Sequence, residues 1–310
     1  MIIFLFFFTN RYHTTVSIIA MPRPKANKKV LGKALAAAKN IHYGRTTPTK
    51  ARKKNVKTSQ LVEDSTSNEK DVGNRILNSP TKRLFNGLKR ELMPLANQKN
   101  AVAMKGYMRG QFEFLGIQAP GRRAAAKQFI SECKKLDSVQ IKMLVDLMWE
   151  QPEREFQQTA LDLCAKSLPV LCGKTDEDCL ESLMWTKTII TTKSWWDTVD
   201  LLASKVVGGL VSHSPTKLNP VMDAWIQDEN MWLRRTAILH QLGYKNKTDQ
   251  DRLFRYCSTC ADEKEFFIRK AIGWALRNYH YINKDAVRTF VAKNRSKLSD
   301  LSIKEALKHD

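Results

Sequence analysis

The sequence predicts an all-α protein built from repeated helix pairs and preceded by a basic arm. From about residue 80, apolar residues recur at three- and four-residue spacing through one segment after another, with short polar breaks between them. No alternating pattern of the kind found in strands competes with this spacing. The helical segments also recur at a nearly constant interval, which is typical of proteins that stack one helix pair on the next.

The expected helices follow one another along the body of the chain. Pro152, Pro215 and Pro220 lie where helices begin or break, because proline fits the first turn and cannot continue the hydrogen-bond ladder. Between these points, each segment keeps an apolar stripe on one side. The expected helices cover residues 81–96, 120–135, 138–149, 152–167, 177–190, 194–211, 216–226, 230–242, 249–260, 264–278, 284–291 and 300–308.

The positive charge of the chain is concentrated near its beginning. The net charge is +21, and residues 1–60 hold 13 Lys and Arg but no acid, since Glu63 is the first. This leaves +8 on the remaining residues. Such a distribution indicates a polyanionic partner, nucleic acid first and an anionic membrane surface second.

Three regions are expected along the chain. Residues 1–20 contain a short apolar run, too brief to cross a bilayer and without the preceding basic residues of a secretory signal, so we expect an upstream start or a targeting extension before Met21. Residues 21–78 carry few large apolar residues and are expected to be a disordered basic arm. Residues 79–310 are expected to form the helical-repeat domain.

The basic cluster at residues 50–57 fits a nuclear localisation signal. A solvated tail that touches DNA nonspecifically explains it equally well, and a mitochondrial presequence less well. We therefore expect a nuclear protein, with mitochondria or the cytoplasm as second choices.

The cysteines indicate reduced thiols rather than a disulfide framework or a metal site. Cys257 and Cys260 form a single CxxC without the second pair that tetrahedral zinc needs. The histidines are scattered, so neither a metal nor a cofactor is expected. No segment is long and apolar enough to span a membrane.

An internal repeat identifies the kind of helical protein. Residues 232–239 align with residues 267–274 at a shift of 35, which places Arg234 on Arg269 and Arg235 on Lys270. Helix pairs at this interval are typical of HEAT-type solenoids, whose concave side accommodates an extended partner. The basic residues on these helices suggest that the partner is a phosphate backbone.

The segment 193–200 separates residues expected in the core from a candidate site. Helical spacing predicts one apolar stripe, made of Trp195, Val199, Leu202 and Val206. Trp196 and Asp200 fall one turn apart on the neighbouring stripe. Ser194 and Asp197 are spaced as a capping box, whereas Asp200 has no such role. A carboxylate beside an indole, away from the core stripe, is therefore the candidate site.

Five blocks of sequence resemble the AlkD-type DNA alkylation repair proteins, which are HEAT-like DNA glycosylases. They are residues 107–123, 149–162, 192–200, 230–239 and 264–277, in order and at the spacing of that family. The resemblance covers about two-thirds of the chain and says nothing about the basic arm.

The resemblance implies a catalytic cleft formed by Asp200, Trp196 and Trp274, with Arg235 beside them. It also implies that Tyr107 and Gln118 approach the DNA duplex. From the residues alone, Trp274 also fits a core stripe, Arg235 a solvated surface and Tyr107 a packing role. Further DNA contacts are expected from the basic residues near the site: Lys193, Arg234, Arg269 and Lys270.

These residue types suit the removal of a charged base. A purine alkylated at N3 or N7 already carries positive charge, so its departure needs no general acid. Asp200 would stabilise the positive sugar and help to orient water, while the tryptophans offer electron-rich faces. Arg235 would hold a phosphate without reading sequence.

The leading expectation is a monofunctional, monomeric DNA glycosylase that hydrolyses the N-glycosidic bond of alkylated purines in duplex DNA. 3-Methyladenine and 7-methylguanine are the type substrates. The first competing hypothesis is a catalytically silent HEAT-repeat binder of damaged or branched DNA. Two further hypotheses are a helical scaffold for a protein partner and a lyase that acts through Lys193.

Overall fold

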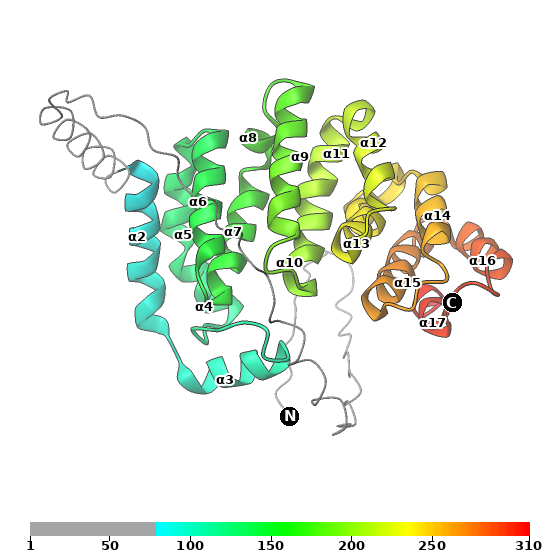
Figure 1. Cartoon of the computed structure of the whole chain (residues 1–310), viewed down its shortest axis with the longest axis horizontal. Coiled ribbons are helices and arrows are strands. Elements are labelled where there is room, and N and C mark those ends of the chain that lie inside the picture. The colour runs from blue at the N-terminus through cyan, green and yellow to red at the C-terminus, as the bar shows by residue number, and fades with distance from the viewer. Residues whose placement is uncertain (1–78) are drawn as a thin grey trace, which may run out of the picture. The chain divides into compact units, whose positions relative to one another are not determined.

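The computed structural model describes residues 79–310, and the regular secondary structure in this range is helical (Figure 1). In the same range, one isolated β-bridge joins Glu113 to Glu153. The predicted all-α class is confirmed. The predictions for residues 1–78, namely the extension, the disordered arm and the localisation signal, lie outside the described residues.

The helices of the described part are numbered as in Figure 1. They are α2 (Pro80–Leu92), α3 (Gln98–Tyr107), α4 (Ala119–Ala125), α5 (Lys127–Glu132), α6 (Ser138–Glu150), α7 (Arg154–Lys166), α8 (Leu168–Cys172), α9 (Asp176–Ile190), α10 (Trp196–Leu201), α11 (Gly208–His213), α12 (Pro215–Trp225), α13 (Met231–Leu239), α14 (Gln250–Thr259), α15 (Phe266–His280), α16 (Lys284–Lys293) and α17 (Asp300–Ala306). A π-helical turn, Leu202–Val207, joins α10 to α11.

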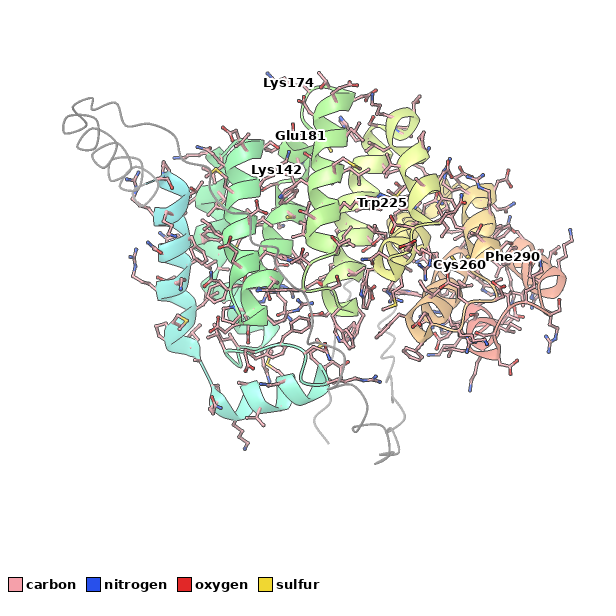
Figure 2. All side chains as sticks on the ribbon, viewed as in Figure 1. Lys142, Lys174, Glu181, Trp225, Cys260 and Phe290 are labelled. Carbon is pink, nitrogen blue, oxygen red and sulfur yellow. The ribbon has the colours of Figure 1, made fainter. Side chains whose placement is uncertain are left out.

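The helices pack as successive pairs, as the internal repeat predicts. The pairs are α6 with α7, α9 with α11 and the π-helical turn before it, α12 with α13, α14 with α15, and α16 with α17. The helices α7, α10, α13, α15 and α17 also pack on one another in this order. On the other side of the pairs, Lys142 of α6 forms an ion pair with Glu181 of α9 at 2.8 Å, and both are labelled in Figure 2.

One hydrophobic core runs through the stack from Phe85 in α2 to Ala306 in α17. All six cysteines are buried as free thiols. Cys260, labelled in Figure 2, lies in this core, and burial raises its pKa to about 12, so that it stays protonated. Within residues 79–310, no cluster of His, Cys, Asp and Glu is arranged to hold a metal, and no helix is long and apolar enough to cross a membrane.

Two short helices were not predicted, for a physical reason. α3 buries only Ala101, so its sequence shows no apolar stripe, and it is marked instead by its cap, where the Asn97 side chain accepts the backbone N–H of Asn100 at 3.0 Å. α8 is a five-residue helix with a proline in its first turn. The helix predicted to reach residue 96 ends at Leu92, where a 3₁₀ turn containing Pro94 follows.

Candidate active site

The helix that carries the candidate site has the two stripes predicted for it. Val199, Leu202 and Val206 are buried in the core, and Trp195 packs against them from the side. Trp196 and Asp200 are half-buried and lie one turn apart on α10. The π-helical turn begins two residues after Asp200, and such turns often occur at functional sites.

The capping box predicted from Ser194 and Asp197 is wrong. Asp197 is buried and accepts both a 3.0 Å hydrogen bond from Nε and a 2.7 Å hydrogen bond from Nη2 of Arg154. Ser194 donates to the Ile190 carbonyl of the preceding helix. A bidentate arginine is a stronger partner for a buried carboxylate than one backbone N–H, which explains the difference.

Asp200 is held by a second buried arginine. Arg235 of α13 donates from Nε to one carboxylate oxygen at 2.7 Å and from Nη2 to the other at 2.9 Å. Its Nη1 donates to the carbonyl of Phe267 at the start of α15. The side chain of Arg235 is 5 % exposed and that of Asp200 is 15 % exposed. The guanidinium thus orients the carboxylate, and the phosphate contact expected of Arg235 stays a prediction.

Several opposing effects determine the pKa of Asp200. Burial raises the pKa of this carboxyl above its usual value, and the neighbouring charge of Asp197 raises it further. Arg235 opposes both through its charge and its hydrogen bonds. The carboxylate is therefore less strongly acidic than a surface aspartate, although its ion pair keeps the charged form accessible.

Aromatic side chains from several elements contact one another around Trp195 and Trp196, which precede Asp200 on the same helix. The ring of Tyr107, which is 52 % exposed, meets Trp196 edge-on with 5.9 Å between the ring centres. Behind them, Trp195 contacts Phe267 and Trp232 with ring centres 5.2 and 6.0 Å apart. Partial burial, together with Asp197, raises the pKa of Tyr107, so its hydroxyl remains protonated.

Two other expected site residues lie at neighbouring elements. Trp274 is half-buried on α15, the helix that supplies the Phe267 carbonyl to Arg235. Gln118 is exposed and directly precedes α4. The structure thus joins Tyr107 to Trp196 and Asp200 to Arg235 by direct contacts.

The four basic residues expected to contact DNA are engaged by the protein itself. Arg234 forms two 2.8 Å hydrogen bonds with the carboxylate of Glu263 and also donates to two carbonyls. The other three make these contacts: Arg269 with the Glu263 carbonyl, Lys270 with Glu305, and Lys193 with the Glu150 and Gln151 carbonyls. Arg269 bonds only six residues away, whereas Glu263 lies 29 residues from Arg234, Glu305 lies 35 from Lys270 and Glu150 lies 43 from Lys193, distances that local spacing does not reveal.

Lys193 also bears on the hypothesis of a lyase. Burial and the nearby Arg154 lower the pKa of its ammonium group, as a Schiff-base lysine requires. However, two of its three hydrogen-bond donors are taken by carbonyls at the end of α6. The arrangement favours a structural role over a nucleophilic one.

Sequence reasoning missed Arg154, the partner of Asp197. It is fully buried on α7, and its guanidinium lies 3.7 Å from the centre of the Phe112 ring. Two features of the sequence point to Arg154. It lies within the second block of the resemblance, residues 149–162, and it is a charged residue on a helix with many buried positions.

The fold and the site define a helical-repeat protein with an arginine-held carboxylate beside aromatic rings. A family model described as DNA alkylation repair enzyme matches residues 88–309. This chain belongs to the DNA alkylation repair enzyme family and is therefore a DNA-binding repair enzyme.

Solved structures resemble the same part of the chain. One titled as a predicted DNA alkylation repair enzyme from Enterococcus faecalis is 33 % identical, with a TM-score of 0.62, and the match covers 69 % of this chain and 95 % of that one. AlkD2 from Streptococcus mutans is 20 % identical, with a TM-score of 0.49, over 66 % of this chain and 98 % of that one. No curated protein matches the chain.

Proposed function

We propose that the protein is a monofunctional DNA glycosylase that hydrolyses the N-glycosidic bond of N3- or N7-alkylated purines in duplex DNA. The observation that carries this proposal is Asp200, a partly exposed carboxylate that is fixed by Arg235 and lies one helical turn from Trp196. A fixed negative charge next to aromatic faces is the environment that a positive, departing nucleoside requires.

In the proposed reaction, the bond between the sugar C1′ and the alkylated nitrogen breaks, and its electron pair leaves with the purine. The purine becomes neutral while positive charge develops on the sugar. Asp200 stabilises that charge and helps to orient a water molecule, whose oxygen then bonds to C1′ and loses a proton. No step needs an acid, because the base is already positively charged.

The neighbouring side chains have distinct roles in this proposal. Trp196, Tyr107 and Trp274 contribute aromatic faces that attract the positive sugar and base and exclude bulk water. Arg235 acts on the carboxylate, since its donors are directed at Asp200 and a backbone carbonyl.

The test is base release from duplex DNA that carries 7-methylguanine or 3-methyladenine. We expect release of the free base and an intact abasic strand that breaks only after alkali treatment. Binding without base release would support the silent DNA binder instead. Strand cleavage without alkali, together with a covalent adduct between Lys193 and the DNA after borohydride reduction, would support the lyase.

We also propose that the protein works as a monomer in the nucleus, within base excision repair. The basic cluster at residues 50–57 and the high positive charge motivate the location. A fluorescent fusion with Lys53 and Lys54 changed to Gln should lose nuclear accumulation, and light scattering should give the mass of one chain.

A further inference from the structure

Two adjacent buried charges at the start of α7 take no part in the proposed chemistry. Arg154 and Glu155 are both 0 % exposed. Burial of a charged group is costly unless that group is fully paired, so each must have strong partners. The partners of Glu155 lie in segment 115–117, and those of Arg154 lie at the start of α10 and in the residues before it.

Glu155 holds the segment that leads to Gln118. Its carboxylate accepts hydrogen bonds of 2.8 to 3.0 Å from the backbone N–H groups of three successive residues, Leu115, Gly116 and Ile117. Gly116 has φ +85°, and a Cβ there would lie 2.1 Å from the Asn97 carbonyl oxygen at the start of α3. The chain between Tyr107 and Gln118 is thereby fixed to α7.

Arg154 holds the beginning of the helix that carries Asp200. Besides its two bonds to Asp197, its guanidinium donates to the Lys193 carbonyl and to the Thr198 hydroxyl, both at 2.9 Å. The backbone N–H of Arg154 donates to the carbonyl of Glu113 at 2.8 Å. The same residue therefore contacts segment 112–113 and segment 193–198.

We propose that Arg154 and Glu155 are positioning residues that fix segment 112–118 relative to Asp200. The proposal rests on the proposed function, in which Asp200 faces the sugar, and on the expectation that Gln118, at the end of this segment, approaches the duplex. The two segments lie far apart in sequence, and one dipeptide joins both. A misplacement of about 1 Å between catalytic groups and substrate costs about 10²-fold in rate, so this spacing matters for excision.

Arg122 provides a matched control. It is also buried, at 3 % exposed, and it pairs with Asp162 of α7 at 2.8 Å and with Thr159 at 3.1 Å. These contacts link α4 to α7 rather than to α10. Arg122→Lys and Arg154→Lys thus impose the same chemical change on two buried arginines, of which only Arg154 contacts the helix with Asp200.

The experiment is single-turnover excision of 7-methylguanine at a series of protein concentrations. We expect Arg154→Lys to lower the rate at saturating protein by about 10²-fold and to leave the half-saturating concentration within about twofold. Glu155→Gln, which loosens segment 115–117, should instead raise the half-saturating concentration. Arg122→Lys should lower the melting temperature alone. Asp197→Asn, which changes the other partner of the pair, should reproduce the effect of Arg154→Lys.

Amide hydrogen exchange on the same full-length variants separates this proposal from the proposed function. Arg154→Lys and Asp197→Asn should deprotect residues 193–200, and Glu155→Gln should deprotect residues 112–118, while Arg122→Lys deprotects neither. Equal rate losses in Arg154→Lys and Arg122→Lys, or unchanged protection, overturn the positioning role. A wild-type protein that releases no base refutes the glycosylase, and the exchange pattern still decides whether the dipeptide couples the segments.

Discussion

Asp200→Asn removes the charge of the site carboxylate with almost no change in side-chain size, and its amide N–H then faces one of the two guanidinium donors of Arg235. In Asp200→Asn the remaining oxygen still accepts a hydrogen bond from Arg235, whereas the charge facing the sugar is lost. We expect excision to fall by about 10²-fold or more, the effect of losing one electrostatic stabiliser. DNA affinity should stay equal or rise. Single-turnover rates and binding to methylated duplex measure both, and an unchanged rate would remove Asp200 from the mechanism.

The raised pKa of Asp200 predicts an acid limit to excision. Only the ionised carboxylate stabilises the positive sugar, so activity is present above this pKa and is lost as the pH falls through it. Burial and Asp197 raise this pKa, while Arg235 opposes the shift and Arg154 pairs with Asp197. The enzymatic rate, corrected for spontaneous depurination, should therefore decline at a higher pH than that of an exposed aspartate, about 4. The residual rate of Asp200→Asn should lack this decline.

Arg234 and Arg235 are adjacent in sequence and should give different losses. Arg235→Ala leaves the Asp200 carboxylate without its partner, which raises its pKa further and disorients it, so excision should fall strongly at neutral pH. Arg234→Ala breaks the pair with Glu263 and should mainly lower the melting temperature. Because both pairs are internal, salt should not abolish the difference. A larger rate loss in Arg234→Ala would show that the assignment of cleft residues on α13 is shifted by one residue.

Spacing along the helix predicted which side of α10 carries Asp200, but it did not predict which residues of other helices contact that side. Asp200 and Arg235 are 35 residues apart, and Arg154 and Asp197 are 43 apart. Local pattern gives the direction of a side chain on its own helix. The contacts between helices depend on how those helices stack, which only the structure provides.

The helix α11 lies very close to the 3₁₀ turn His240–Gly243, which follows α13. Gly208 begins α11, and a Cβ added to it would lie 2.3 Å from the His240 carbonyl oxygen, directly after α13. Gly208→Ala should push α11 away from the residues that directly follow α13, the helix that carries Arg235. We expect a loss of about 1 to 3 kcal/mol in unfolding free energy and a reduced excision rate. Thermal melting and single-turnover rates measure these effects.

Gly87→Ala is the control for this substitution. In the middle of α2, the nearest atom to an added Cβ is an Arg90 side-chain nitrogen at 4.0 Å. Alanine is favoured over glycine inside a helix, so this variant should gain about 0.5 to 1 kcal/mol without a change in excision. A stable, fully active Gly208→Ala variant would show that this contact can accommodate an added methyl group.

Sequence pattern predicted the long helices well and the irregular elements poorly. The periodicity through 194–211 is correct, yet it does not indicate that Leu202–Val207 is a π-helical turn. The buried residues Val199, Leu202, Val206 and Leu210 keep three- and four-residue spacing through this turn, so the pattern does not distinguish it from an α-helix. α3 was missed because it packs through a small cluster of its own around Ala101, Met108 and Phe114, in place of a full stripe.

Over the whole described part, ion pairs join one helix pair to the next. Arg154–Asp197 joins α7 to α10, Asp200–Arg235 joins α10 to α13, and Lys270–Glu305 joins α15 to α17. Each basic residue engaged in this way is partly neutralised and fixed in direction. Arg235 and Lys270, which the repeat suggested as phosphate ligands, thus also join helices, and their contact with DNA stays a prediction. Because these side chains are engaged within the protein, we expect the basic arm to contribute to DNA binding beside them.

Removal of residues 1–78 should therefore weaken DNA binding and leave the helical body folded. The family match begins at residue 88, and the described helices form one continuous core, so the shortened protein should keep its helical circular dichroism and its melting transition. Nonspecific DNA affinity should fall and its salt dependence should flatten, because fewer phosphate counterions are released when the 13 Lys and Arg of residues 1–60 are absent. Single-turnover excision at saturating protein should stay nearly unchanged, since Asp200 and its partners are retained. An unchanged salt slope would mean that phosphate contacts come from the helices after all, and a lost excision rate would place the arm within the catalytic unit.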